Sequence, residues 1–397
     1  MYIIDDNKSK FFKLIAPLLI NRGVILHKIS EFDCAARSKN SGIFISHVDN
    51  KFNCEKDEDF INFFKKNKFS RAVLLKPACD EFKVFNYFNS AVTVLETPFL
   101  FENESPLNTF YIHYFLEIIL QDQPNLPCAS QESTRLVNLV RKIATTDATV
   151  LINGPTGSGK EVLSSLIHAF SNRQNNPFVA LNCAAIPDQM LESILFGHEK
   201  GAFTGAVQAN KGLVRAADTG TILLDEISEM PLNLQSKLLR VIQEKQVLPI
   251  GASTEVEVDV RILATTNRNM FDEVKSGNFR EDLFYRLNVF PLNNLSLAER
   301  IDDLTPIVAH MLFKSYNETG ESLSITEDAL IALKQHSWPG NVRELDNIVQ
   351  RAKILSLGGK ITLADLIFDN HELGEQPNTA DILAAKFKSS STGEVVQ

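Results

Sequence analysis

The residues with the clearest chemical meaning form a glycine-rich loop near the middle of the chain. Residues 154–160 read Gly-Pro-Thr-Gly-Ser-Gly-Lys and follow a short β-rich run at 149–152. This spacing matches the G-x-x-x-x-G-K pattern of a phosphate-binding loop. Glycines let the backbone N–H groups point at phosphate, while the lysine can reach the β- and γ-phosphates. The residues predicted to bind nucleotide here are Gly154, Pro155, Thr156, Gly157, Ser158, Gly159, Lys160 and Glu161.

The residues after this loop predict the helix that a phosphate site needs. Leu163, Leu166, Ile167 and Phe170 recur at helical spacing, so the amino end of a helix faces the bound anion and its dipole favours negative charge. Glu161 departs from the pattern, because a Ser or Thr usually stands there as a Mg²⁺ ligand. A glycine-rich turn without a ligand is the alternative for the loop taken alone.

A hydrophobic strand that ends in two carboxylates supplies the second half of an ATP site. Residues 221–224 are apolar or β-branched and can be buried on both faces of a sheet, and Asp225 and Glu226 follow them. Asp225 would hold Mg²⁺ directly or through water, and Glu226 would polarise the attacking water. An ordinary strand ending in an acidic helix cap is the alternative. Combined with the glycine-rich loop, the pair predicts ATP hydrolysis.

Between these two halves lies a segment whose chemistry is not that of ATP binding. Residues 201–206 read Gly-Ala-Phe-Thr-Gly-Ala, so glycines can act as hinges around an aromatic ring and a hydroxyl. Because a large exposed apolar group is normally avoided, the segment predicts contact with a partner. A generic turn with a buried Phe is the alternative. The predicted contact residues are Gly201, Ala202, Phe203, Thr204, Gly205 and Ala206.

At about 130–370 the chain resembles the central domain of bacterial enhancer-binding proteins, the AAA+ ATPases that activate sigma-54 RNA polymerase. Residues 201–206 match the family's sigma-54-contacting loop without a change, inside a longer match at 195–206. The family also commonly has Glu at the place of Glu161. The resemblance implies an activator that remodels the closed promoter complex, with ATP and Mg²⁺ as cofactors. It implies a homo-oligomer, dimer to hexamer, whose partner is the sigma-54 RNA polymerase holoenzyme.

The resemblance assigns nucleotide sensing to three polar residues. Asn182, in Ala-Leu-Asn-Cys-Ala-Ala-Ile, corresponds to a switch asparagine that holds the catalytic glutamate until the nucleotide state releases it. Thr266 and Asn267 match the first sensor, which can detect the γ-phosphate.

It also assigns roles to three arginines. Arg280 and Arg286 match arginine fingers that a neighbouring subunit supplies, and Arg343 matches the second sensor on the lid. A guanidinium arriving from the next subunit would stabilise the charge that spreads over the γ-phosphoryl oxygens, and would link hydrolysis to assembly. The implied catalytic residues are Lys160, Asn182, Glu226, Arg280 and Arg286.

These residues require an α/β fold: a P-loop AAA+ core with a small all-α lid, preceded by a receiver-like doubly wound α/β domain. We expect the core at 130–300 and the lid at 301–370. In the lid, a helix begins near Thr326, and Asn341 stands three residues before Glu344 as in a capping box. The family's Pro-Leu-Arg-Glu-Arg stretch becomes Ser-Leu-Ala-Glu-Arg at 296–300, a change that can alter lid coupling.

Residues 1–122 resemble a response-regulator receiver, joined by a linker at 123–129 to the core. The receiver's chemistry is altered: Ser46 stands where the phosphoacceptor Asp is expected, Lys76 near the strand-four hydroxyl, and Thr97 in place of the Lys before Pro98. Without nucleophile and cation, phosphoryl transfer is not expected. The prediction is a pseudo-receiver regulated by dimerisation or a partner, with Asp49 as the nearest alternative acceptor.

The ends and the composition narrow the choice of partners. Residues 371–397 contain one short apolar stretch and no recognisable helix-turn-helix, so promoter DNA would be reached indirectly or through a partner unless the chain is truncated. The net charge of −9 gives no basic field for nucleic acid. Five cysteines without a C-x-x-C pair argue against zinc and a disulfide scaffold. With no signal peptide or long apolar span, we expect a cytoplasmic protein without a membrane partner.

Two other function classes remain open. A AAA+ remodeller acting on another protein or on DNA would share the ATP residues without needing the loop at 201–206. A non-catalytic adaptor would be expected to lose Lys160, Glu226 or the arginines, all of which are present. Local matches at 338–346 and 287–292 look most like flagellar-gene regulators of the family, by analogy alone.

Overall fold

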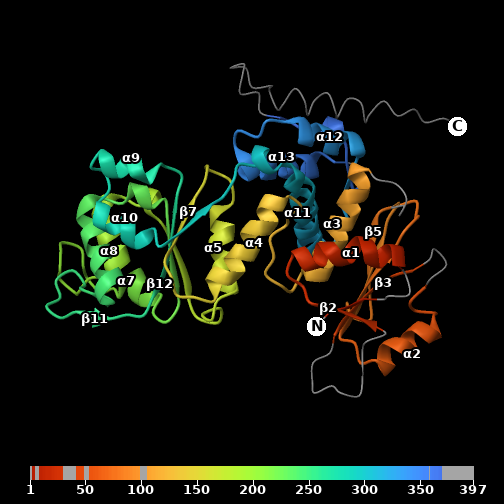
Figure 1. Cartoon of the computed structure of the whole chain (residues 1–397), viewed down its shortest axis with the longest axis horizontal. Helices are drawn as coiled ribbons and strands as arrows, with labels where there is room; N and C mark the ends of the chain where they lie inside the picture. Colours follow the sequence, from red (N-terminus) through yellow and green to blue (C-terminus); the bar gives the residue numbers. More distant parts are fainter. Residues whose placement is uncertain are drawn as a thin grey trace.

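The computed structural model describes residues 2–4, 9–29, 42–48, 53–98, 105–356 and 358–368, in three units along the chain. Figure 1 shows the N-terminal sheet at one end, the ATPase core at the other and the helical lid between them. Within the described residues, no helix is long and apolar enough to cross a membrane.

The N-terminal unit is a six-stranded sheet with the order β2-β1-β3-β4-β6-β5. All pairs are parallel except that between β5 and β6. The predicted doubly wound fold is confirmed, with one difference: the segment between β4 and β6 forms an edge strand where strand–helix alternation would place a helix. The elements are β1 (Tyr2–Ile4), α1 (Ser9–Asn21), β2 (Leu26–Lys28), β3 (Ile43–His47), α2 (Glu58–Lys66), β4 (Arg71–Lys76), β5 (Lys83–Tyr87), β6 (Val92–Glu96) and α3 (Pro106–Leu120).

Helix α3 is buried on all sides, and twelve of its fifteen residues are buried. Its sequence is apolar around the whole helix, which is the pattern of a helix covered on every face. It begins at Pro106 after Ser105, whose hydroxyl accepts the Asn108 N–H. One face packs on the N-terminal sheet and the other on lid helix α11, within a single hydrophobic core (Figure 1). The N-terminal unit and the lid are therefore fused rather than tethered.

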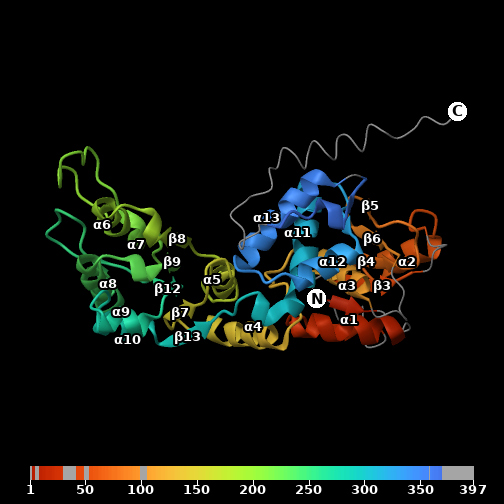
Figure 2. The same cartoon turned by 90° about the horizontal axis from the view of Figure 1, so that it is seen from above.

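The ATPase core is a five-stranded parallel sheet with the order β13-β7-β12-β9-β8. Helices α4 and α5 cover the face toward the lid, and α7, α8 and α10 lie on the other side (Figures 1 and 2). The elements are α4 (Gln131–Ala144), β7 (Val150–Asn153), α5 (Lys160–Ala169), β8 (Phe178–Asn182), α6 (Asp188–Phe196), α7 (Gly212–Ala216), β9 (Thr221–Asp225), α8 (Leu232–Glu244), β10 (Gln246–Val247), β11 (Val256–Glu257), β12 (Arg261–Thr266), α9 (Met270–Lys275), α10 (Glu281–Leu287) and β13 (Phe290–Asn293).

The lid is helical, with a short parallel pair of strands. It comprises η4 (Ala298–Asp303), α11 (Leu304–Thr319), β14 (Ser324–Ile325), α12 (Glu327–Gln335), α13 (Asn341–Leu355), β15 (Lys360–Ile361) and η5 (Leu363–Asp365). The expected capping box at α13 is wrong in one half. Glu344 does accept the Gly340 N–H at 2.8 Å, but the N-cap residue is Gly340, without a side-chain cap. Asn341 adopts a positive φ of 55° and bonds elsewhere.

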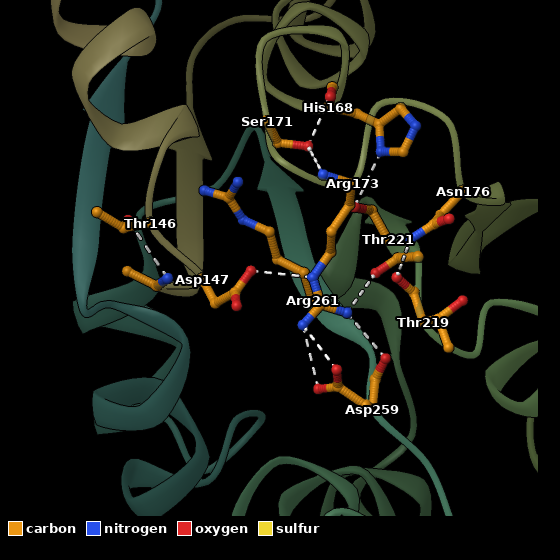
Figure 3. A network of polar contacts seen from close by, with 12 residues as sticks. Thr146, Asp147, His168, Ser171, Arg173, Asn176, Thr219, Thr221, Asp259 and Arg261 are labelled. Carbon is orange, nitrogen blue, oxygen red and sulfur yellow. Dashed lines mark hydrogen bonds and ion pairs between the residues drawn. The ribbon is translucent and has the colours of Figure 1, made fainter.

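The edge of the core sheet opposite the glycine-rich loop is held by Arg173, which follows α5 (Figure 3). Its Nε donates to Asp147 at 2.9 Å, and its Nη2 donates to both carboxylate oxygens of Asp259 at 3.1 and 3.0 Å. Its Nη1 also donates to the carbonyls of Gly220 and Asp259. The guanidinium thus joins the segments that lead into β7, β9 and β12. The buried Arg261 lies beside it and donates to the end of α4.

Replacing Arg173 with lysine tests whether these hydrogen bonds stabilise the core sheet. A single ammonium cannot reproduce five bonds in the fork geometry of a guanidinium, so we expect Arg173→Lys to lower the free energy of unfolding by about 1–3 kcal/mol. Urea unfolding followed by circular dichroism measures the change, with the exposed Arg135→Lys on α4 as the matched control. A loss below about 0.5 kcal/mol, the range of ordinary surface substitutions, would contradict a structural role.

Candidate active site

The glycine-rich loop joins β7 to α5 as the sequence predicts, and it holds its lysine inside. Gly159 precedes the helix with φ of 98°, a left-handed conformation that favours glycine. Lys160 is 8% exposed, and its Nζ donates to the carbonyls of Gly154 and Pro155 at 2.9 and 3.2 Å. Burial lowers the pKa of the Lys160 ammonium below its ordinary value, although Asp225 and Glu226 oppose that shift. The ammonium is therefore placed where phosphate oxygens would replace the two carbonyls.

Two residues that the sequence reasoning missed support this loop from behind. Asn294 is buried just after β13, and its Nδ2 donates to the Ser158 carbonyl at 3.0 Å. Arg300 of η4 is also buried and donates to the same carbonyl at 2.6 Å. The signal for Asn294 was a polar residue directly after a short apolar strand. Its partner became visible only once β13 was paired with β7.

The lid contacts the loop through backbone groups. The Gly157 carbonyl accepts the N–H groups of Val342 and Arg343 at 3.0 and 3.3 Å. Asn341 Nδ2 donates to the Thr156 carbonyl at 3.0 Å. A Cβ on Gly157, whose φ is 74°, would lie 2.5 Å from the Gly340 carbonyl oxygen. Only glycine fits at this contact, which places the start of α13, including Arg343, over the loop.

Asp225 and Glu226 stand at the carboxyl end of β9, and a threonine not singled out in the sequence orients both. Thr265 of β12 donates its hydroxyl to Asp225 Oδ1 and accepts the Glu226 N–H at 3.2 Å. Asp225 is 8% exposed. Glu226 has a φ of 52°, in the left-handed region. The strained backbone turns the second carboxylate away from the line of the strand.

The resemblance pairs Asn182 with the glutamate, but the structure pairs it with the aspartate. Asn182 Nδ2 donates to Asp225 Oδ2 at 3.0 Å, and its Oδ1 accepts the N–H groups of Ala184 and Ala185. The physical reason is register, because Asn182 and Asp225 are direct partners in the parallel ladder of β8 and β9. The Glu226 carboxylate makes no hydrogen bond with any described residue of the chain.

The two residues of the predicted first sensor, Thr266 and Asn267, bind different parts of the core. Asn267 donates from Nδ2 to the hydroxyl of Thr156 at 3.0 Å, at the glycine-rich loop. Thr266 is fully buried, and its hydroxyl donates to Ser228 at 3.1 Å. Successive residues of a strand face opposite sides of the sheet, so Thr265 and Thr266 serve different partners. The repeated Thr-Thr in the sequence gave no basis for choosing between them.

Two cavities adjoin the loop. One, of about 430 Å³, brings most of the predicted ATP residues together; it is lined by Thr156, Gly157, Gly159, Lys160, Glu161, Val162, Asp225, Glu226, Met311, Val342, Arg343 and Asp346. The second, of about 560 Å³, lies between the loop, the 125–127 segment and the lid, and is mainly apolar with a few polar groups. The first suits phosphates and the second suits a nucleoside.

Arg280 and Arg286 line neither cavity. Both are exposed at the start and in the last turn of α10, on the side of the core sheet away from α5 (Figure 1). Arg280 forms an ion pair with Asp282 at 2.7 Å. They do not reach either cavity of their own chain, and their role at a neighbouring subunit stays a prediction.

The segment 201–206 projects from the core beyond α6, at the end opposite to the N-terminal sheet (Figure 2). Gly201 and Gly205 have φ of 81° and 107°, and the Gly201 N–H donates to the Ala206 carbonyl at 2.9 Å. Phe203 is 45% exposed, and its ring lies 4.9 Å from that of His198. The predicted combination of glycine hinges and an accessible aromatic ring is present.

The three positions with altered receiver residues lie at the carboxyl ends of strands in the N-terminal sheet. Ser46 is buried and its hydroxyl donates to the His47 carbonyl. Lys76 forms an ion pair with Glu96 at 2.7 Å, and the Thr97 N–H donates to the Lys76 carbonyl. An internal ion pair therefore occupies this edge. Asp5, Asp6 and Asp49 lie outside the described residues, as does the tail from 369 on.

A phosphate-binding loop after β7, two carboxylates after β9 and a helical lid over the loop define a P-loop nucleotide-binding protein of the AAA+ class. Residues 126–293 match the Sigma-54 interaction domain, and residues 298–382 match the AAA+ ATPase lid domain. These two regions of the chain are thus similar to those two domain families.

Among its relatives, the chain is 53% identical over 242 residues to the Response regulator protein FleR of Pseudomonas aeruginosa, covering 60% of this chain and 51% of the relative. It is 42% identical over 293 residues to the Transcriptional regulatory protein FlbD of Caulobacter vibrioides, covering 71% and 64%. The chain thus spans about half the length of the first curated relatives it matches. The crystal structure of NtrX from Brucella abortus in complex with ADP covers 98% of this chain and 90% of its own, with a TM-score of 0.59 and 26% identity.

The position of Thr265 yields a test. Thr265→Val keeps the shape but removes the hydroxyl that orients Asp225 and the Glu226 backbone, so we expect ATP hydrolysis to fall about 10- to 100-fold, as for other groups that orient a metal-binding carboxylate. Thr265→Ser keeps the hydroxyl and should retain activity. Steady-state phosphate release by the two variants measures the difference. Equal rates for the two would show that the hydroxyl does not orient the carboxylates.

Proposed function

We propose that this protein hydrolyses ATP to activate sigma-54 RNA polymerase, remodelling the closed promoter complex so that transcription starts. One observation carries the proposal: the segment 201–206 is inserted between β8, which ends at Asn182, and β9, whose end holds both catalytic carboxylates. Strand β8 ends at Asn182, β9 ends at Asp225, and their side chains are hydrogen-bonded at 3.0 Å. Everything between them, including α6, the segment and α7, is one excursion anchored at the ATP site.

Nucleotide binding rests on the two cavities beside the glycine-rich loop. NtrX was crystallised with ADP and with ATP, and this chain shares its fold over 98% of its length. Lys160, the loop N–H groups and Arg343 are the groups in reach of a triphosphate. Mg²⁺ is usually held by one or two carboxylates together with phosphate oxygens and waters. Asp225 fits that role, with Glu161 in the same cavity, and the ion would neutralise charge on the phosphates.

Hydrolysis needs a group to polarise water and a cation to stabilise the transition state. The Glu226 carboxylate makes no hydrogen bond with the described residues, and Glu226 lines the phosphate cavity, as a general base requires. Arg280 and Arg286 are exposed away from their own site. We infer that they reach the γ-phosphate of a neighbouring copy, so that the working form is a closed ring, a hexamer assembled from dimers.

The hydrogen bonds around Asn182 offer a way to transmit the nucleotide state. Loss of the γ-phosphate changes the charge that Asp225 and Glu226 face, and Asn182 is bonded to the first of them. From there the chain enters α6, where the Ser193 hydroxyl lies 2.7 Å from His198 Nδ1. The His198 ring contacts Phe203. A change at the site would thus alter how the 201–206 segment is presented to sigma-54.

The proposal also covers the N-terminal unit, the contact with promoter DNA and the target genes. We propose that residues 1–122 form a pseudo-receiver acting through a partner or through dimerisation, because the Lys76–Glu96 pair occupies the sheet edge where phosphotransfer groups belong. Promoter DNA would be contacted through a partner or by a segment beyond the described residues. The protein would act in the cytoplasm, where the polymerase works. The local resemblance to flagellar regulators and the likeness to FleR favour flagellar genes as targets.

The sigma-54 contact can be tested without a known promoter. We expect the purified protein to bind sigma-54 in ADP plus a γ-phosphate transition-state mimic, and Thr204→Ala to lose this binding at least about tenfold, because the hydroxyl stands beside the exposed Phe203. Thr145→Ala, an exposed threonine after α4, is the matched control. Absence of binding by the wild type, despite normal ATP hydrolysis, would instead indicate a AAA+ remodeller with another client.

The pseudo-receiver proposal has its own test. Incubation with a small-molecule phosphodonor should leave the intact mass of the protein unchanged, because Ser46 is buried and hydrogen-bonded to the backbone. A true receiver treated in parallel is the positive control. A mass increase of one phosphoryl group that maps to Asp49 would refute the proposal.

A further inference from the structure

A buried cluster of charged and polar groups joins the N-terminal unit to the lid. Glu117 of α3 is 2% exposed and accepts hydrogen bonds from Arg22 Nη1 and from His310 Nδ1, the latter at 2.7 Å. Arg22 follows α1, is 4% exposed, and its Nη2 lies 3.2 Å from Nδ1 of His113. His310 belongs to α11. One carboxylate therefore connects α1, α3 and a lid helix.

Two members of this neighbourhood also form walls of the 560 Å³ cavity beside the glycine-rich loop. His310 lines it from α11, and Asn125 lines it from the linker. Asn125 Oδ1 accepts a hydrogen bond from Arg22 Nη1 at 3.4 Å. The same cavity is also lined by Ser158 and Gly159 of the loop. The nucleotide-binding loop and groups held by the N-terminal unit thus face one space.

The charges in the cluster are well satisfied. Burial alone would raise the pKa of the Glu117 carboxyl, but the His310 hydrogen bond and the Arg22 charge outweigh it and hold that pKa below its usual range. Burial, with the neighbouring Arg22 charge, lowers the pKa of His113 to about 3. His113 is therefore neutral while Glu117 and Arg22 form an ion pair. Since an unpaired buried charge is costly, the pair fixes both side chains in place.

We propose that Arg22 and Glu117 of the N-terminal unit are positioning residues for the nucleoside half of the bound nucleotide, acting through Asn125 and His310. This inference rests on the proposed ATP site. With Nδ1 donating to Glu117, the His310 ring is fixed in orientation against the cavity, and Asn125 is anchored by Arg22. The N-terminal unit completes the wall that a base and ribose would touch, whereas the phosphate cavity is lined by the loop, the carboxylates after β9 and lid residues, without a residue of that unit.

Linkage gives the arrangement a regulatory consequence. If docking of the N-terminal unit raises nucleotide affinity, bound nucleotide must strengthen that docking by the same factor. A partner that broke the Arg22–Glu117 pair would release His310 and Asn125 together. Binding of such a partner would lower the affinity for nucleotide without any contact between the partner and the phosphates.

The test compares a nucleotide with its phosphates alone on the full chain. Calorimetric titrations measure the affinity of ADP and of inorganic tripolyphosphate for the wild type and for Glu117→Gln. We expect ADP affinity to fall about tenfold, the equilibrium factor of one charged hydrogen bond, and tripolyphosphate affinity to stay within about twofold. In a His310→Ala background, Glu117→Gln should add little further loss of ADP affinity, because the two act through one contact.

Controls separate positioning from general damage. Asp122→Asn removes an exposed carboxylate, 68% accessible, two residues after α3 and paired with Arg71; both affinities should be unchanged. If Glu117→Gln does not fold, Arg22→Met with Glu117→Gln removes both charges, leaves none unpaired, and is held to the same expectation. Equal loss of both ligands, or unchanged ADP affinity in a folded variant, overturns the inference. A wild type that binds neither ligand overturns the proposed ATP site itself.

Discussion

The lid is held to the nucleotide site through the backbone of the glycine-rich loop, and the arrangement of the whole molecule depends on that contact. The Gly157 carbonyl accepts two N–H groups at the start of α13. The backbones approach so closely that a Cβ on Gly157 would collide with the Gly340 carbonyl oxygen. Asn341 adds a bond from its side chain to the neighbouring carbonyl. The core sheet presents the loop, the lid closes on it, and the N-terminal unit is fused to the lid through α3.

A second constraint is that one buried carboxylate lies between two functions. Asp225 is bonded to Thr265, which orients it at the phosphate cavity, and to Asn182, after which the chain leads through α6 to the segment 201–206. Both bonds follow from the register of parallel strands. A group held from two sides cannot adjust to one partner without affecting the other. The hydrogen bonds of Asp225 thereby couple the phosphate cavity to the start of the excursion that carries the segment 201–206.

The sequence predicted those parts of the fold and site that are local. The glycine-rich loop and the carboxylates after a strand are consecutive residues, and strand, loop and helix suffice to place them. Thr265, Asn294 and Arg300 escaped because their partners lie 40, 136 and 142 residues away in the chain. The error at Asn341 has the same origin, since a tertiary contact with the loop displaced the local cap. The sequence of α3 is apolar on every side, which indicates a fully buried helix, but it does not identify the N-terminal sheet and α11 as the elements that cover it.

The double burial of α3 has a mechanical consequence. A helix gripped by a sheet on one face and by α11 on the other cannot slip against either without exposing apolar surface, so lid and N-terminal sheet must turn as one body. Rotation of the lid about its contact with the loop would then be magnified at the outer edge strands, as at the tip of a lever. Small adjustments at a phosphate would become large displacements of a surface that other molecules can sense.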